Sequence, residues 1–126
     1  MQKQSTRKTG ADSEQAACEF LLSLGYEIIQ RNYYCRDGEL DIVARIDSEL
    51  AFVEVKSIVE QPEVSPFELL SKLKLRRVER SIEYWLMENQ CQSAAWHFEY
   101  IAVVLTEDLQ VKQIEHIPQP ELYDSV

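Results

Sequence analysis

Three charged side chains around a short polar turn are the residues of this chain best suited to chemistry. Asp41 lies in one apolar run, Glu54 and Lys56 lie in the next, and Asp47-Ser48 separates the two runs. Mg²⁺ prefers one or two carboxylates and fills its remaining positions with water and substrate phosphate. A lysine beside such an ion can donate to an attacking water or stabilise charge on a phosphate oxygen. The set therefore predicts a Mg²⁺ site, with Mn²⁺ as an alternative ion, that supports phosphodiester hydrolysis.

The two runs, residues 38–45 and 50–56, predict a β-hairpin. If the turn centres on Asp47-Ser48, the numbers of paired residues sum to 95, so Asp41 faces Glu54 and Glu39 faces Lys56. Side chains alternate between the two faces of a strand, which places these four charged residues on one face. The opposite face is expected to be apolar and to pack against a helix, with Leu40, Ile42, Ala44, Ala51, Val53 and Val55.

The same spacing also fits a hairpin whose charges are only structural. In that interpretation Lys56 pairs with Glu39 or Glu54, and such surface ion pairs are common and contribute little to stability. Glu39 would then either pair with Lys56 and tune it, or begin its strand in solvent. The charged face is partly covered by apolar residues, namely Val43, Leu50 and Phe52. Partly buried charges need partners or a metal, which moves the balance from the structural interpretation towards an ion site.

Length and composition favour one domain over residues 1–126, because 45% hydrophobic content suits a single core. Residues 1–10 are expected to be flexible and residues 118–126 to form a tail. No apolar stretch approaches the roughly 20 residues that cross a bilayer. The first nine residues are polar and basic, unlike a secretory signal. We therefore expect a cytoplasmic protein with no membrane segment.

Periodicity and turn residues order the chain as αβββαββ. A helix is expected over residues 12–24, with Asp12 or Ser13 as its cap. A second helix is expected from Ser65-Pro66 to about Asn89. Strands are expected over residues 26–34, 38–45, 50–56, 96–105 and 110–117. A single mixed sheet with helices on its faces, in an α/β fold, accommodates this order.

The charge distribution bears on nucleic-acid binding. The net charge of −9 argues against a protein that coats DNA. Lys74 and Arg77 nevertheless share a stripe beside the apolar face of the second helix, where they could contact phosphate. The other basic residues of this helix suit a solvated face, namely Lys72, Arg76 and Arg80. His97 and His116 stand alone in the sequence and are interpreted as ordinary strand polarity. So small a domain has little surface for gripping duplex DNA, which favours a homodimer or a partner protein.

Two segments resemble the signature of the YraN-like bacterial proteins, namely Gly-Glu-Leu-Asp-Ile-Val-Ala at 38–44 and Phe-Val-Glu-Val-Lys at 52–56. That poorly characterised family is placed in the PD-(D/E)xK, or restriction-endonuclease-like, nuclease superfamily. The resemblance covers most of the chain. It implies a restriction-endonuclease-like fold and a Mg²⁺-dependent nuclease acting on DNA or a related nucleic acid.

The resemblance also implies roles for individual residues. Asp41, Glu54 and Lys56 would be the superfamily triad, with the two carboxylates holding Mg²⁺. Glu14 would match the acidic residue that the first helix often contributes to the metal site. The residues alone give Glu14 another interpretation, an acid stabilised by the helix N-terminus.

The chain departs from the family pattern at three places. Ser13 replaces a glycine, Ser57-Ile58 replaces Thr-Arg, and Glu99 stands where aspartate commonly follows the phenylalanine. The lost arginine removes an expected phosphate contact. Together with the acidic balance, this supports a second hypothesis, a nucleic-acid-binding or adaptor module that keeps the nuclease fold without the chemistry.

Overall fold

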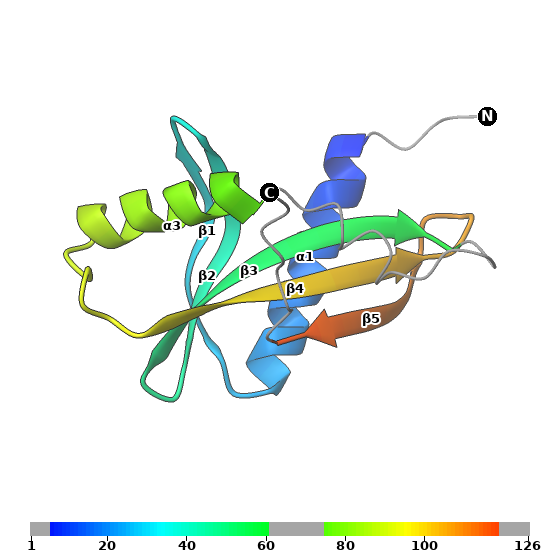
Figure 1. The fold of residues 1–126 in the computed structure, drawn as a ribbon. Helices are drawn as coiled ribbons and strands as arrows, with labels where there is room; N and C mark the ends of the chain where they lie inside the picture. Colours follow the sequence, from blue (N-terminus) through cyan, green and yellow to red (C-terminus); the bar gives the residue numbers. More distant parts are fainter. Residues whose placement is uncertain (1–5, 61–74, 119–126) are drawn as a thin grey trace.

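One mixed five-stranded sheet with a helix on each face forms the body of the molecule (Figure 1). The computed structural model describes residues 6–60 and 75–118. The predicted α/β class and the order αβββαββ are confirmed. The elements are α1 (Thr6–Ser23), β1 (Glu27–Cys35), β2 (Gly38–Ile46), β3 (Glu49–Val59), α3 (Leu75–Glu88), β4 (Trp96–Leu105) and β5 (Val111–Ile117). Within these two ranges, no helix is long and apolar enough to cross a membrane.

The strands lie in the order β1-β2-β3-β4-β5. Neighbouring strands are antiparallel except β3 and β4, which are parallel over their whole shared length, from Leu50↔Trp96 to Val59↔Leu105. A parallel pair requires a crossover connection, and here the crossover contains α3. The chain therefore places α3 on one face of the sheet, while α1 covers the other.

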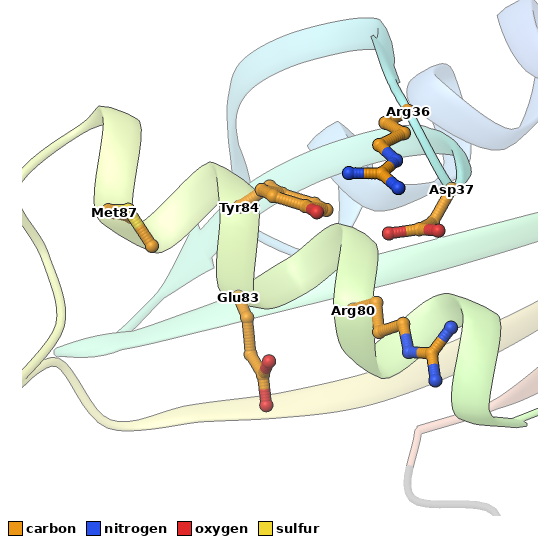
Figure 2. A pocket seen from close by; sticks show the side chains of 6 residues that line it. All are labelled: Arg36, Asp37, Arg80, Glu83, Tyr84 and Met87. Atoms are coloured by element: carbon orange, nitrogen blue, oxygen red, sulfur yellow. The ribbon is translucent and has the colours of Figure 1, made fainter.

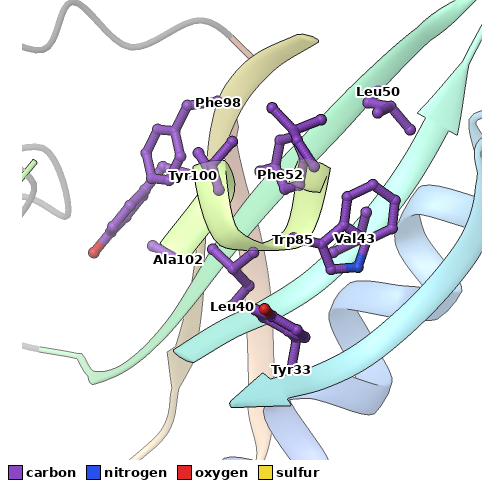
Figure 3. Close-up of a cluster of buried hydrophobic side chains, with 11 residues drawn as sticks. Tyr33, Leu40, Val43, Leu50, Phe52, Trp85, Phe98, Tyr100 and Ala102 are labelled. Carbon is purple, nitrogen blue, oxygen red and sulfur yellow. The ribbon is translucent and has the colours of Figure 1, made fainter. Parts of the chain in front are cut away.

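Each helix packs on its own apolar core. Trp85 of α3 meets Phe52 of β3 edge to face at 5.6 Å between ring centroids, inside the cluster drawn in Figure 3. This α3-side core also contains Tyr33, Leu40, Val43, Leu50, Ile82, Leu86, Phe98, Tyr100 and Ala102. The α1-side core contains Ala17, Cys18, Leu21, Ile42, Ala44, Ala51, Val53, Ile101, Val103 and Leu105. Consecutive residues of β3 thus serve opposite cores, as the period of two requires.

The predicted register of the β2–β3 hairpin is confirmed from Ile46↔Glu49 to Ile42↔Val53, where every pair of numbers sums to 95. Asp47 takes a left-handed φ of 57° in the turn, a conformation that aspartate tolerates better than most residues. The backbone pairing between β2 and β3 ends at Ile42↔Val53, one residue before Asp41 and Glu54 on each strand. The two carboxylates therefore lie where the strands begin to separate.

Leu40 is an exception to the predicted alternation. It was expected on the face of Ile42 but belongs to the α3-side core, with Tyr33. The neighbouring strand explains the change. Asn32 of β1 has a left-handed φ of 55°, and the β1–β2 ladder pairs Arg31↔Ile42 and Tyr33↔Leu40 but not Asn32 with Asp41. This local irregularity interrupts the alternation of β2 at Asp41.

Several predicted boundaries also change. Helix α1 begins at Thr6, so residues 6–10, expected to be flexible, are helical. Ser13 is not a cap, because its buried hydroxyl accepts a hydrogen bond from Ser57 at 2.6 Å. Strand β3, expected to end at Lys56, continues through residues 57–59 because they pair with β4. The start signal predicted for the second helix at Ser65-Pro66 lies outside the described residues.

Candidate functional site

The carboxyl groups of Asp41 and Glu54 meet at the fork between β2 and β3. Asp41 Oδ2 accepts a hydrogen bond from the backbone N–H of Val55 at 2.8 Å, which fixes this side chain where the ladder has ended. The two carboxyl groups are close enough that the negative charge of Asp41 raises the pKa of Glu54. The structure therefore brings together the two acidic side chains that the register placed opposite each other.

Burial dominates the electrostatics of this carboxyl pair. Loss of solvent raises the pKa of Asp41 to about 6, although the Val55 N–H opposes the rise. Burial and then the negative charge of Asp41 raise the pKa of Glu54 to about 8, and the Lys56 ammonium opposes that rise. Both shifts are upward, so the two carboxyl groups titrate as one coupled pair that resists losing its last proton.

Tyr100 borders the same pair from β4, where it stands in register with Glu54. Burial and the nearby Glu54 carboxylate raise the pKa of the Tyr100 phenol to about 12. Sequence reasoning assigned Tyr100 no place near the site, because only the parallel pairing of β3 with β4 brings it there. Its ring belongs to the α3-side core and shields one side of the Glu54 carboxyl group.

Lys56 and Glu39 flank the carboxyl pair without pairing with each other. Lys56 is exposed on β3, and its charge lowers the pKa of Glu54. Glu39 is exposed on β2, and its charge raises the pKa of both Asp41 and Glu54. The expected Glu39–Lys56 pairing is not formed, because the strands have already separated at this point. Among the described residues, neither Lys56 nor Asp41 takes part in the ion pairs of a purely structural hairpin.

Glu14 of α1 faces the site from the side. With the Asn32 amide oriented to donate, its nitrogen lies 2.7 and 3.2 Å from the two carboxylate oxygens of Glu14. Burial raises the pKa of Glu14, while Arg31 lowers it, and the Glu14 charge raises the pKa of Asp41. Arg31 also donates to Gln15 at 2.9 Å. The Arg31-Asn32 dipeptide therefore anchors this part of α1 beside the carboxyl pair.

The donor set fits a hard cation, since two carboxyl groups converge and further acidic residues surround them. Within residues 6–60 and 75–118, no three His, Cys, Asp or Glu side chains are arranged to hold an ion. Asp41 and Glu54 are the residues that would hold Mg²⁺, and Glu14, the third predicted ligand, acts on Asp41 through its charge. Of the predicted nucleic-acid contacts, Lys74 and the side chain of Arg77 lie outside the described residues.

A second polar cluster corrects the interpretation of His97 and His116 as isolated residues. The Nε2 atoms of both histidines are hydrogen-bonded to the fully buried Glu99 carboxylate, at 2.5 Å for His97 and 2.6 Å for His116. The Tyr26 hydroxyl donates to both Glu99 oxygens at 2.8 and 3.0 Å. His97 Nδ1 lies 3.4 Å from Glu49 Oε1, an ion-pair distance without a hydrogen bond. The cluster connects β3, β4 and β5 with the residue before β1, and its central Glu99 carboxylate is fully buried.

A polar pocket of about 390 Å³ lies between the β1–β2 turn and α3 (Figure 2). It is lined by Arg36, Asp37, Arg80, Glu83, Tyr84 and Met87. Arg80, expected on a solvated face, is exposed but stands at the edge of this concave surface. No sequence signal connects Arg36 with α3, because residues of the turn and of the helix meet only through the fold.

The raised pKa of Glu54 predicts a stability that falls with pH when EDTA removes divalent cations. Glu54 keeps its proton in the folded state up to about pH 8 but loses it in the unfolded chain near 4.5. The folded state therefore binds more protons across this interval, and the free energy of unfolding should decrease by about 1–3 kcal/mol from low to high pH. Urea denaturation at several pH values measures the trend.

Glu54→Gln should flatten that curve, since the amide does not titrate. The matched control is Glu107→Gln, an exposed residue of the β4–β5 connection, which should leave the slope unchanged. A wild-type free energy of unfolding that rises between about pH 4.5 and pH 8 would contradict the raised pKa of Glu54.

Comparison with known proteins gives a consistent family match. A family model described as "Uncharacterised protein family UPF0102" matches residues 13–103. A UPF0102 protein of Pelobacter propionicus is 39% identical over 113 residues, which cover 88% of this chain and 80% of the relative. Another, of Caldicellulosiruptor saccharolyticus, is 32% identical over 111 residues, which cover 88% of this chain and 94% of the relative. A third, of Geotalea daltonii, is 37% identical over 121 residues, which cover 91% of this chain and 90% of the relative.

Proposed function

The chain belongs to the UPF0102 family, the YraN-like proteins that its motifs resemble, and from its site we propose that it is a Mg²⁺-dependent nuclease. It would hydrolyse phosphodiester bonds in DNA or a related nucleic acid. The observation that supports this proposal most is the convergence of the Asp41 and Glu54 carboxyl groups, which are partly buried and both have a raised pKa. Two partly buried carboxyl groups held together without a cationic partner between them are a costly arrangement, and a divalent cation would relieve it.

Each residue of the site has a definite task in such a reaction. Asp41 and Glu54 would hold the ion through carboxylate oxygens, and the Val55 N–H keeps Asp41 in one orientation. Bound Mg²⁺ would lower the pKa of a water molecule and neutralise charge on the phosphate. The Lys56 ammonium would stabilise the negative charge that develops on the phosphate oxygens in the transition state. Glu14 and Glu39 add negative charge that attracts the cation.

A cleavage assay tests the proposal. The wild type is incubated with plasmid, single-stranded and branched DNA and with RNA, in Mg²⁺, Mn²⁺ or EDTA. We expect metal-dependent cutting of at least one substrate and its loss in Asp41→Ala, because the ion loses half of its protein ligands. Melting curves supply an independent readout. Mg²⁺ should raise the melting temperature of the wild type, since a ligand that binds only the folded state stabilises it, but not that of Asp41→Ala.

A non-catalytic binding or adaptor module is the second candidate. It is favoured by the lack of a three-residue ligand group within the described ranges and by the net charge of −9. This module would bind nucleic acid but would cut none of the substrates in either metal ion. We propose further that two copies, or a partner protein, supply the contact surface that a domain of this size lacks. Comparing the mass of the free and the nucleic-acid-bound protein in solution tests that assembly.

A further inference from the structure

The pocket between the β1–β2 turn and α3 lies close to the candidate active site along the chain. Asp37 lines the pocket, and Asp41 follows four residues later on β2, about 13 Å at the usual rise of a strand. The pocket volume of about 390 Å³ is within the range of sites that bind small molecules. A strand of nucleic acid held at Asp41 would therefore have a concave surface within reach.

The two arginines of the pocket are available to a ligand. Within the described residues, neither Arg36 nor Arg80 forms a hydrogen bond or an ion pair, although Asp37 and Glu83 line the same pocket. In the view of Figure 2, the guanidinium of Arg36 points towards Tyr84, whereas that of Arg80 points away from this ring. The two cations thus stand at different parts of the rim rather than around a single point.

An aromatic ring also lines the pocket. Tyr84 is half-buried, packs against the α3-side core and presents the remainder of its ring to the pocket. Bases stack on such rings irrespective of their identity, while guanidinium groups bind phosphates. The two carboxylates, Asp37 and Glu83, give the lining a formal charge of zero. This balance disfavours a compact polyphosphate but suits a unit that combines phosphate with an amino-bearing base.

We propose that this pocket binds one nucleotide unit of a single strand, on the same strand as the bond that is cut but at a distance from it. The proposal rests on the proposed function and deepens it. Arg36 and Arg80 contact the phosphates on either side of the unit, and Tyr84 stacks on its base. The carboxylates of Asp37 and Glu83 accept hydrogen bonds from amino groups of the base. The pocket thereby sets the position of the strand relative to Asp41.

Fluorescence anisotropy with a labelled single-stranded oligonucleotide tests this in EDTA, where no cutting occurs. Each lost phosphate contact lowers the slope of log K against log salt by about 0.7 for single strands. We therefore expect Arg36→Gln/Arg80→Gln to lower the slope by about 1.4 and to weaken binding about tenfold at low salt. Arg45→Gln is the matched control, because Arg45 is equally exposed on β2 but pairs with Glu27 at 3.7 Å, away from the pocket. It should change neither quantity.

An oligonucleotide of equal length that lacks one base tests the stacking on Tyr84. The wild type should prefer the intact strand over this abasic strand by about 5- to 100-fold, and Tyr84→Leu should abolish the preference while binding the abasic strand normally. The second measurement guards against simple misfolding of the variant.

The outcomes separate the pocket from the nuclease. The pocket proposal is contradicted if the double arginine variant binds with the wild-type affinity and salt slope, or if the wild type does not bind at all. The cleavage assay then decides separately whether the protein is a nuclease. Arginine-dependent binding without any metal-dependent cutting supports the pocket and overturns the nuclease. Displacement of the strand by an acidic peptide, but not by unlabelled oligonucleotide, would assign the pocket to a protein partner and overturn the proposal.

Discussion

Replacing Lys56 with methionine should lower kcat for Mg²⁺-dependent cleavage by about 100- to 1000-fold, the usual loss when one charge-stabilising donor is removed. Methionine keeps the length of the side chain and removes only the ammonium. Lys56 is exposed, so its replacement leaves the apolar core intact. Its charge reaches the Glu54 carboxyl group, which places the ammonium beside the point where phosphate would bind. The loss should therefore appear in kcat, with little change in the Kd for nucleic acid.

Lys112→Met is the matched control for this change. Lys112 is also an exposed strand lysine, but it lies on the edge strand β5 and pairs with Glu60. The Lys112→Met variant should cleave nucleic acid at the wild-type rate. Lys56→Arg should retain part of the activity, because the planar guanidinium keeps the charge but not the compact shape of the ammonium. Equal losses in both methionine variants, or a loss confined to KM, would contradict the role given to Lys56.

The site also shows what the sequence could predict. Turn chemistry at Asp47-Ser48 and strand alternation were enough to predict the register from Ile46↔Glu49 to Ile42↔Val53, because both are local properties. Alternation failed at Leu40, since the left-handed Asn32 on a neighbouring strand interrupts it. The residues of β2 alone do not reveal a backbone irregularity that lies on β1.

Contacts between segments that lie far apart in the sequence were harder to predict. Ser13 was expected to cap a helix but binds Ser57, forty-four positions away, in the interior. His97 and His116 looked isolated because their meeting point, Glu99, is reached from β4 and β5 only after the strands have paired. The same holds for Arg36 and Arg80 around the pocket. Residue types suggested chemistry in each case, but the partner depended on the fold.

Glu99→Ala should be the most destabilising single change among the polar residues of the described chain. The Glu99 carboxylate is fully buried and accepts hydrogen bonds from Tyr26, His97 and His116. Its removal leaves a hydroxyl and two imidazoles without an acceptor, and a cavity beside them. Breaking a buried polar pair in this way costs about 3–5 kcal/mol of the free energy of unfolding. For a domain of this size, the melting temperature should fall by about 10–20 °C.

Urea denaturation of the wild type and the variant measures the loss, and Glu115→Ala is the control. Glu115 lies on β5 beside His116, but among the described residues its carboxylate accepts a hydrogen bond only from the Gln113 amide, at 2.6 Å. Its removal should therefore change stability by less than about 0.5 kcal/mol. Glu99→Gln keeps the shape and one acceptor oxygen, and should cost about 1–3 kcal/mol.

A double-mutant cycle between Glu99 and His116 isolates their interaction from the effect of the cavity. Residues that share a hydrogen bond in a buried network couple by about 0.5–3 kcal/mol, whereas independent sites add. The cluster joins β5 to β4 and to the start of β1, so removing it should also expose the amides of β5 to hydrogen exchange ahead of global unfolding. If the Glu99 and Glu115 variants unfold at the same urea concentration, or if the cycle closes with no coupling, the buried carboxylate does not hold this edge of the sheet.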